Sequence, residues 1–96
     1  MNSFRETTIE QSLNKAVKSY DGIAVKLVSP GFVGMPDRLV LLPGGRLGFV
    51  EVKAPGKRPR AIQTVRHKQL RQLGFKVYVL DNKDQIGGII NDVIKG

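Results

Sequence analysis

The chain has 96 residues, of which 41% are hydrophobic and 25% charged. This length and balance predict one globular domain over residues 1–96 and exclude a disordered chain or two separate cores. No apolar run approaches the roughly 20 residues that cross a bilayer, and the N-terminus lacks the plan of a signal peptide. The absence of cysteine excludes disulfides and thiolate metal sites and favours an intracellular location.

The charge balance indicates a polyanionic partner. Sixteen Lys and Arg residues stand against eight Asp and Glu, which gives a formal charge of +8 and a pI of about 10.2. A small basic domain attracts polyanions through long-range electrostatics. Nucleic acid is therefore the leading partner and an anionic membrane surface a distant second, while an effect on solubility alone is the plain alternative.

The first third of the chain predicts a helix, a strand and a loop. Residues 3–20 follow helical spacing, with Ser3 and Glu6 as a capping box and Glu10 at the edge of the apolar stripe. The stripe comprises Ile9, Leu13, Ala16, Val17 and Tyr20. Residues 23–28 are β-branched and short enough for a strand, and the prolines and glycines of residues 29–36 predict a loop.

Residues 37–42 and 47–53 predict a hairpin joined by Pro43-Gly44-Gly45. A three-residue loop, with a type I turn and then a left-handed glycine, would place Asp37 opposite Glu51. That register puts both carboxylates at the end of an apolar face, beside the core. The other members of this face would be Leu39, Leu41, Leu47, Phe49 and Lys53. A two-residue Gly44-Gly45 turn would instead oppose Asp37 to Val52 and separate the carboxylates.

The remaining residues predict a basic loop, two helices and a strand. Residues 54–60 form the loop, and residues 61–73 form a helix closed by Gly74. Residues 75–80 are a compact strand, and residues 83–94 are a helix weakened by two glycines. The fold class is therefore α/β, a small mixed β-sheet flanked by helices in the order helix, three strands, helix, strand, helix, with a parallel pair made by the long crossover.

Asp37, Glu51 and Lys53 together suit a metal-dependent hydrolase. Two neighbouring carboxylates repel each other unless a cation lies between them, and Mg²⁺ is usually held by one or two carboxylates with waters and phosphate. The Val52 carbonyl is a further candidate oxygen ligand, and Lys53 can orient or deprotonate an attacking water. Taken separately, Pro-Asp is a common turn dipeptide, and Glu-x-Lys is a common ion pair on exposed strands.

The other polar residues predict contacts with a nucleic-acid backbone. His67 is the only histidine, so the sequence disfavours a zinc site, and a phosphate contact or a packing role is expected. Neither Gly-Gly pair has the context of a phosphate loop, so no nucleotide cofactor is predicted. The expected backbone contacts are Lys57, Arg58, Arg60, Arg66, His67 and Lys68.

The motifs in combination resemble the PD-(D/E)XK nuclease superfamily and, more narrowly, the VRR-NUC family. They are Gly34-Met35-Pro36-Asp37, then Phe49-Val50-Glu51-Val52-Lys53-Ala54-Pro55-Gly56, then Gln63-Thr64-Val65-Arg66-His67. The resemblance implies a restriction-endonuclease-like core with Asp37 and Glu51 as metal ligands and Lys53 as the catalytic lysine. It further implies that Glu10, directly or through water, completes the acidic cluster and that Gln63 supports the site.

The same resemblance implies an endodeoxyribonuclease that uses Mg²⁺ or Mn²⁺. The chain looks like the stand-alone viral or bacterial type, which resembles Holliday-junction resolvases and acts on branched DNA as a homodimer. A bacterial cytoplasm or a virus-infected bacterial cell is the implied location. The two symmetric cuts that resolve a junction also favour a two-fold dimer. A flap-type nuclease, a basic binding module without catalysis, and a subunit that needs a partner protein are the alternatives.

Overall fold

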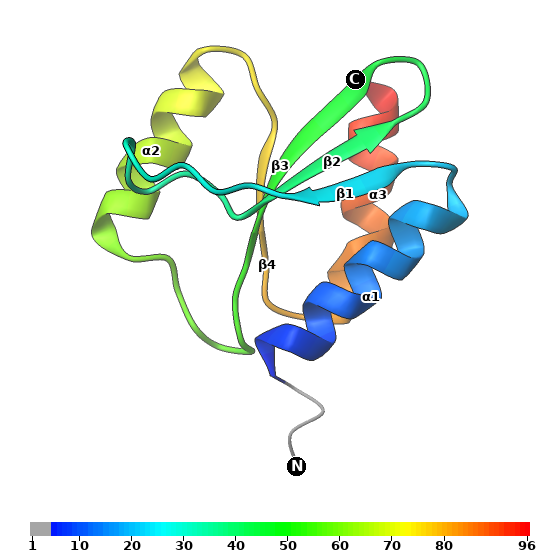
Figure 1. Cartoon of the computed structure of the whole chain (residues 1–96), viewed down its shortest axis with the longest axis horizontal. Coiled ribbons are helices and arrows are strands. Elements are labelled where there is room, and N and C mark those ends of the chain that lie inside the picture. Colours follow the sequence, from blue (N-terminus) through cyan, green and yellow to red (C-terminus); the bar gives the residue numbers. More distant parts are fainter. Residues whose placement is uncertain (1–4) are drawn as a thin grey trace.

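A computed structural model describes residues 5–96. The elements are α1 (Glu6–Ser19), β1 (Ile23–Lys26), β2 (Arg38–Leu42), β3 (Arg46–Val52), α2 (Ala61–Gln72), β4 (Val77–Leu80), a 3₁₀ turn η2 (Lys83–Gln85) and α3 (Ile86–Lys95) (Figure 1). The predicted order of elements is confirmed. The expected capping pair involves Ser3, which lies outside the described residues. The last predicted helix is divided, because its first turn is 3₁₀.

The four strands form one mixed sheet in the order β1-β2-β3-β4. The first three strands are antiparallel neighbours, and β4 runs parallel to β3. In the hairpin, Leu42 pairs with Arg46 and Arg38 pairs with Val50. The predicted register is confirmed, and its extension by one residue sets Asp37 opposite Glu51.

The hairpin loop has the predicted length but a different turn. Gly44 and Gly45 both have positive φ angles, of 84° and 74°. A type I turn needs negative φ at both central residues, whereas a type II turn takes Pro first and a glycine of positive φ second. The prediction of a type I turn was therefore wrong, and Pro43-Gly44 satisfies the type II requirement instead.

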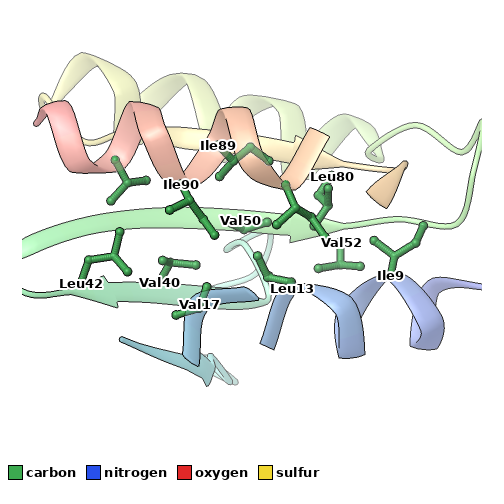
Figure 2. Packing of buried hydrophobic residues seen from close by; sticks show 12 residues of the cluster. Ile9, Leu13, Val17, Val40, Leu42, Val50, Val52, Leu80, Ile89 and Ile90 are labelled. Carbon is green, nitrogen blue, oxygen red and sulfur yellow. The ribbon is translucent and has the colours of Figure 1, made fainter. Parts of the chain in front are cut away.

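The main core lies between one face of the sheet and the helices α1 and α3, while α2 covers part of the opposite face (Figure 1). Figure 2 shows the cluster, which contains Ile9, Leu13 and Val17 of α1, Val40, Leu42, Val50, Val52 and Leu80 of the sheet, and Ile86, Ile89, Ile90 and Val93 of α3. Tyr20, expected to extend the α1 stripe, follows the end of the helix and is exposed. None of the helices within residues 5–96 combines the length and apolarity needed to span a bilayer.

The predicted location of the two carboxylates beside this core was wrong. The buried residues of β2 and β3 alternate, so that Val40 and Val50 face α1 and α3. Glu51 points to the other face, beneath α2, where Leu39 and Phe49 are only half buried. Successive side chains on a strand point to opposite faces. The even-numbered residues form the core because their face is covered by α1 and α3, which bury more apolar side chains than α2.

Candidate metal centre

Asp37 is held at the start of β2 by main-chain contacts from two directions. Its Oδ1 accepts a 3.0 Å hydrogen bond from the Val52 amide. Its carbonyl accepts a 2.8 Å hydrogen bond from the amide of Leu27, just after β1. The preceding Pro36 is buried and favours an extended approach to the strand. The carboxylate therefore projects from a fixed backbone at the edge of the hairpin.

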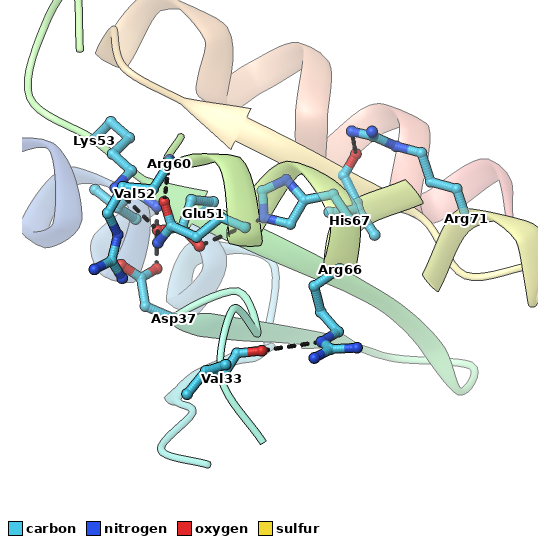
Figure 3. A network of polar contacts seen from close by, with 11 residues as sticks. Val33, Asp37, Glu51, Val52, Lys53, Arg60, Arg66, His67 and Arg71 are labelled. Atoms are coloured by element: carbon cyan, nitrogen blue, oxygen red, sulfur yellow. Dashed lines mark hydrogen bonds and ion pairs between the residues drawn. The ribbon is translucent and has the colours of Figure 1, made fainter. Parts of the chain in front are cut away.

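Glu51 is 2% exposed and is held from above by α2. The side-chain amide of Gln63 donates a 3.0 Å hydrogen bond to Glu51 Oε2. The carbonyl oxygen of the same side chain accepts a 2.8 Å hydrogen bond from the Arg60 amide, so Gln63 also stabilises the first turn of α2. Lys53 Nζ lies 3.6 Å from Glu51 Oε2, with 17% of the lysine side chain exposed. Figure 3 shows Asp37, Glu51 and Val52 close together, with Lys53 beside them.

Burial disfavours the charged form of both carboxylates, and neighbouring acidic charges add to its effect. Burial is the larger cause that raises the pKa of Glu51 to about 7, and the charge of Asp37 adds to it, while Lys53 opposes the shift. Burial likewise raises the pKa of Asp37, and the hydrogen bond from Val52 partly offsets the effect. A cation between the two groups would remove the cost of ionising them together.

The oxygen atoms of Asp37, Glu51 and the Val52 carbonyl suit a divalent cation. Among the described residues, Glu51 Oε1 is buried without a hydrogen-bond partner, as is His67 Nε2, which lies 3.6 Å away. The Val52 amide points toward Asp37, and the N–H and C=O of one strand residue point to the same side, so the Val52 carbonyl also faces Asp37. Two carboxylates and a carbonyl suit Mg²⁺ or Mn²⁺, which take oxygen ligands and retain waters.

Glu10 forms an ion pair with Arg38. Its Oε2 lies 2.7 Å from Arg38 Nη2 and accepts a 3.1 Å hydrogen bond from Arg38 Nε. Within residues 5–96, no group of three or more His, Cys, Asp or Glu side chains has the geometry to hold a metal. Glu10 thus pairs with Arg38, while its charge also raises the pKa of Asp37, and its completion of the acidic cluster, directly or through water, stays a prediction. Arg38 is largely buried on the α1 side of the sheet and requires a counter-charge there.

Glu6 is the acidic residue that the sequence reasoning did not assign to the site. Its charge contributes to raising the pKa of both Asp37 and Glu51, whereas Glu10 contributes only to that of Asp37. Glu6 lies in the first turn of α1, one turn before Glu10. That i, i+4 spacing, which places the two acids on one side of the helix, was the available signal.

Of the six residues expected to contact a nucleic-acid backbone, four are exposed and two are not. Lys57, Arg58, Arg60 and Lys68 are exposed. Arg66 is engaged, because its Nε donates a 3.0 Å hydrogen bond to the Val33 carbonyl (Figure 3). His67 lies on the side of α2 that faces Glu51 and is 2% exposed, so its burial fits the alternative packing role rather than the expected phosphate contact.

A groove of about 420 Å³ lies beside the basic loop. Its walls come from the segment after β3 and from the end of β4, whose carboxyl ends lie at the same edge of the sheet because the strands are parallel. The lining residues are Gly56, Lys57, Arg58, Pro59, Val79, Asp81 and Gln85. Two exposed cations thus flank a channel that begins three residues after Lys53.

Comparison with known proteins finds relatives that match most of the chain, although no family model matches it. A curated protein called "Putative nuclease p44", from Acyrthosiphon pisum secondary endosymbiont phage 1, is 50% identical over 84 residues, which are 88% of this chain and 90% of that protein. A solved structure described as a VRR_NUC domain superposes with a TM-score of 0.84 and 31% identity. That alignment covers 90% of this chain and 94% of the other.

Proposed function

The chain belongs to the VRR-NUC family of nucleases, and from this we propose that it is a divalent-metal-dependent endodeoxyribonuclease whose active site is the Asp37–Glu51 pair with Lys53. The observation that carries the proposal is the buried Glu51 carboxylate, fixed opposite Asp37, with one oxygen that has no hydrogen-bond partner among the described residues. Burying such a group costs free energy unless something compensates it. A bound cation provides that compensation.

In this proposal each residue has a distinct role. Asp37, Glu51 and the Val52 carbonyl would hold Mg²⁺ or Mn²⁺, which would supply charge stabilisation and a more acidic water for phosphodiester hydrolysis. Lys53 lies close enough to Glu51 to orient or deprotonate that water and to balance phosphate charge. Gln63 is a positioning residue, because it contacts Glu51 rather than the substrate.

We further propose that residues 1–96 act as one domain on branched DNA, as a homodimer. The charge of +8 and the exposed Lys57, Arg58, Arg60 and Lys68 support binding of the phosphate backbone. A two-fold dimer would supply the two symmetric cuts that a four-way junction requires. The similarity to a phage protein supports action inside a virus-infected bacterial cell.

The test is cleavage of end-labelled four-way junctions, flaps and plain duplexes in Mg²⁺, Mn²⁺ or EDTA. Wild type should cut branched DNA with either metal and cut nothing in EDTA. Asp37→Ala should lose cleavage, whereas Asp84→Ala, which changes an exposed acid on η2, should retain it.

Three results would contradict parts of this proposal. Equal cleavage by Asp37→Ala would disprove the assigned site. Cleavage of flaps but not of four-way junctions would replace the junction substrate with a flap. Wild type that binds DNA but cuts no substrate with any metal would identify a binding module.

A further inference from the structure

Phe32 is an exposed aromatic residue on the loop between β1 and β2. The loop spans residues 27–37 and ends at Asp37. The Phe32 side chain is 47% exposed. The guanidinium carbon of Arg66, on α2, lies 3.6 Å from the centre of its ring, in the geometry of a cation–π contact. One face of the ring is thus covered by a planar cation, while nearly half of the residue remains open to solvent.

Arg66 connects this loop to α2 through two contacts, and a third contact within α2 holds its guanidinium in place. Besides covering Phe32, it donates a 3.0 Å hydrogen bond from Nε to the Val33 carbonyl. Its Nη1 donates a 2.6 Å hydrogen bond to Gln69, which orients the guanidinium from within the helix. The Phe32 amide donates to the Ser29 carbonyl at 3.1 Å, closing a turn at the tip of the loop. The ring is therefore preorganised rather than free to collapse onto the surface.

The loop also approaches the backbone of α2 at the site. Gly34 has φ of 88°, and a Cβ there would lie 2.7 Å from the carbonyl oxygen of Ile62. Ile62 immediately precedes Gln63, whose amide binds Glu51. From Gly34 the chain continues through Pro36 to Asp37. The same segment therefore holds the Phe32–Arg66 pair at one end and a proposed metal ligand at the other.

We propose that the Phe32–Arg66 pair is a stacking site for an unpaired base of a DNA strand bound at the metal centre. The inference rests on the proposed function and identifies the feature of the substrate that this surface would recognise. An aromatic ring offers a flat apolar surface to any base, and a duplex has no unstacked base to place there. The site would thus favour strands with exposed bases, such as those at a branch point.

The charge of this surface favours a nucleic acid over a second copy of the chain. Val33, the neighbouring residue, is 62% exposed, so an apolar protein contact is the competing occupant. A second copy seated on this surface would bring its own Arg66 against this one, and the two guanidinium groups would repel. A DNA strand supplies both the base for Phe32 and the phosphates for the basic residues of α2.

The experiment is a binding titration by fluorescence anisotropy in EDTA, in which no metal-dependent cleavage takes place. The probes are a labelled 12-nucleotide oligo-dT and a blunt duplex of mixed sequence. Phe32→Ala should weaken binding to the single strand about tenfold, equal to 1.4 kcal/mol for one lost base stack, and leave duplex binding within about twofold. Phe32→Tyr should restore single-strand binding because it retains the ring, while Phe32→Leu should not.

Val33→Ala is the matched control, since it removes exposed apolar surface from the next residue without removing a ring. It should leave both affinities unchanged. The stacking site is disproved if Phe32→Leu binds the single strand as wild type does, or if Phe32→Ala weakens both probes equally. It is also disproved if sedimentation velocity shows that Phe32→Ala turns a dimer into a monomer, because the surface would then be a contact between copies.

The two proposals fail separately in these assays. Binding in EDTA does not depend on cleavage, so the stacking result remains valid even if wild type cuts no DNA. Conversely, a wild type that cuts branched DNA while Phe32→Ala binds oligo-dT normally would disprove only the stacking site.

Discussion

Gln63 joins the first turn of α2 to Glu51 through the two ends of one amide. Its nitrogen lies 3.0 Å from Glu51 Oε2, and its oxygen lies 2.8 Å from the Arg60 amide nitrogen. Gln63 is buried, so both hydrogen bonds form away from competing water. The position of the helix and the orientation of the carboxylate are therefore set by the same side chain.

Replacing Gln63 with Leu should damage both stability and activity. The substitution keeps the side-chain volume but leaves Glu51 Oε2 and the Arg60 amide without this partner, at a cost of about 1–3 kcal/mol for each buried group. Urea denaturation should show a lower free energy of unfolding, and cleavage should slow more than the loss of folded protein explains. Gln72→Ala, which alters an exposed amide of the same helix, should change neither. Full activity of Gln63→Leu would contradict the positioning role.

The Glu51→Gln variant should gain stability relative to wild type as pH rises in metal-free buffer. Burial raises the pKa of Glu51 from 4.5 to about 7. Between these values the carboxyl ionises in the unfolded chain but stays protonated in the folded one, so wild type loses stability as pH rises. The always neutral Gln avoids this loss. The difference should reach on the order of 3 kcal/mol near pH 7.5.

The comparison with Glu51→Gln is needed because the titration of His67 changes stability with pH in the opposite direction to that of Glu51. Burial lowers the pKa of His67 below 6.5, so both proteins lose stability as pH falls below that value. Subtracting the two stability curves, measured by urea denaturation from pH 4.5 to 8, removes the part of this effect that does not depend on the Glu51 charge. A difference that stays constant across the range would show that burial does not raise the pKa of Glu51 and would contradict this prediction.

Substituting Lys53 and Lys57 one at a time should distinguish an effect on catalysis from an effect on DNA binding. Lys53 lies 3.6 Å from Glu51, whereas Lys57 lies on the exposed loop beside the groove. Lys53→Gln should lower kcat by about 10²–10⁴-fold with little change in KM, as expected for a residue that handles the proton of the attacking water. Lys57→Gln should raise KM, more so at low salt, and leave kcat unchanged. Steady-state cleavage at two salt concentrations measures both, and an unchanged kcat in Lys53→Gln would remove Lys53 from the mechanism.

Gly34 should be far less tolerant of alanine than Gly44. Both have positive φ, so each substitution carries backbone strain of about 1 kcal/mol. Only at Gly34 would the new Cβ also meet a backbone oxygen, that of Ile62 at 2.7 Å, while nothing lies within 4 Å at Gly44. Gly34→Ala should thus lower the melting temperature more and reduce cleavage by moving the segment that leads to Asp37. Equal melting temperatures for the two variants would show that this close contact carries no cost.

The hairpin illustrates what local sequence can predict. Pro43-Gly44-Gly45 allows few loop geometries, so the register, and with it the position of Asp37 opposite Glu51, followed from the turn residues. The turn type did not follow, because glycine permits both the type I and the type II conformation.

Features that depend on tertiary packing were harder to predict. The alternation of the strands does not reveal which face two helices cover, so the face that carries Glu51, Leu39 and Phe49 was wrongly expected to adjoin the main core. Glu10 had the right spacing for an acidic cluster, but nothing in the sequence indicated that Arg38 would be buried next to it. His67 is a polar residue type. Its burial on the inner side of α2 brings it next to Glu51, which lies sixteen positions earlier in the chain.

Cleavage of an end-labelled four-way junction in Mg²⁺ by wild type, Asp37→Asn and Glu51→Gln, at equal concentrations of folded protein, tests the assigned metal centre most directly. Each variant keeps the shape of the side chain and removes one negative charge. We predict that wild type cuts the junction and that each variant is at least about a hundredfold slower, since a lost metal ligand removes several kcal/mol of transition-state stabilisation. Cleavage by either variant at the rate of wild type would contradict the assignment.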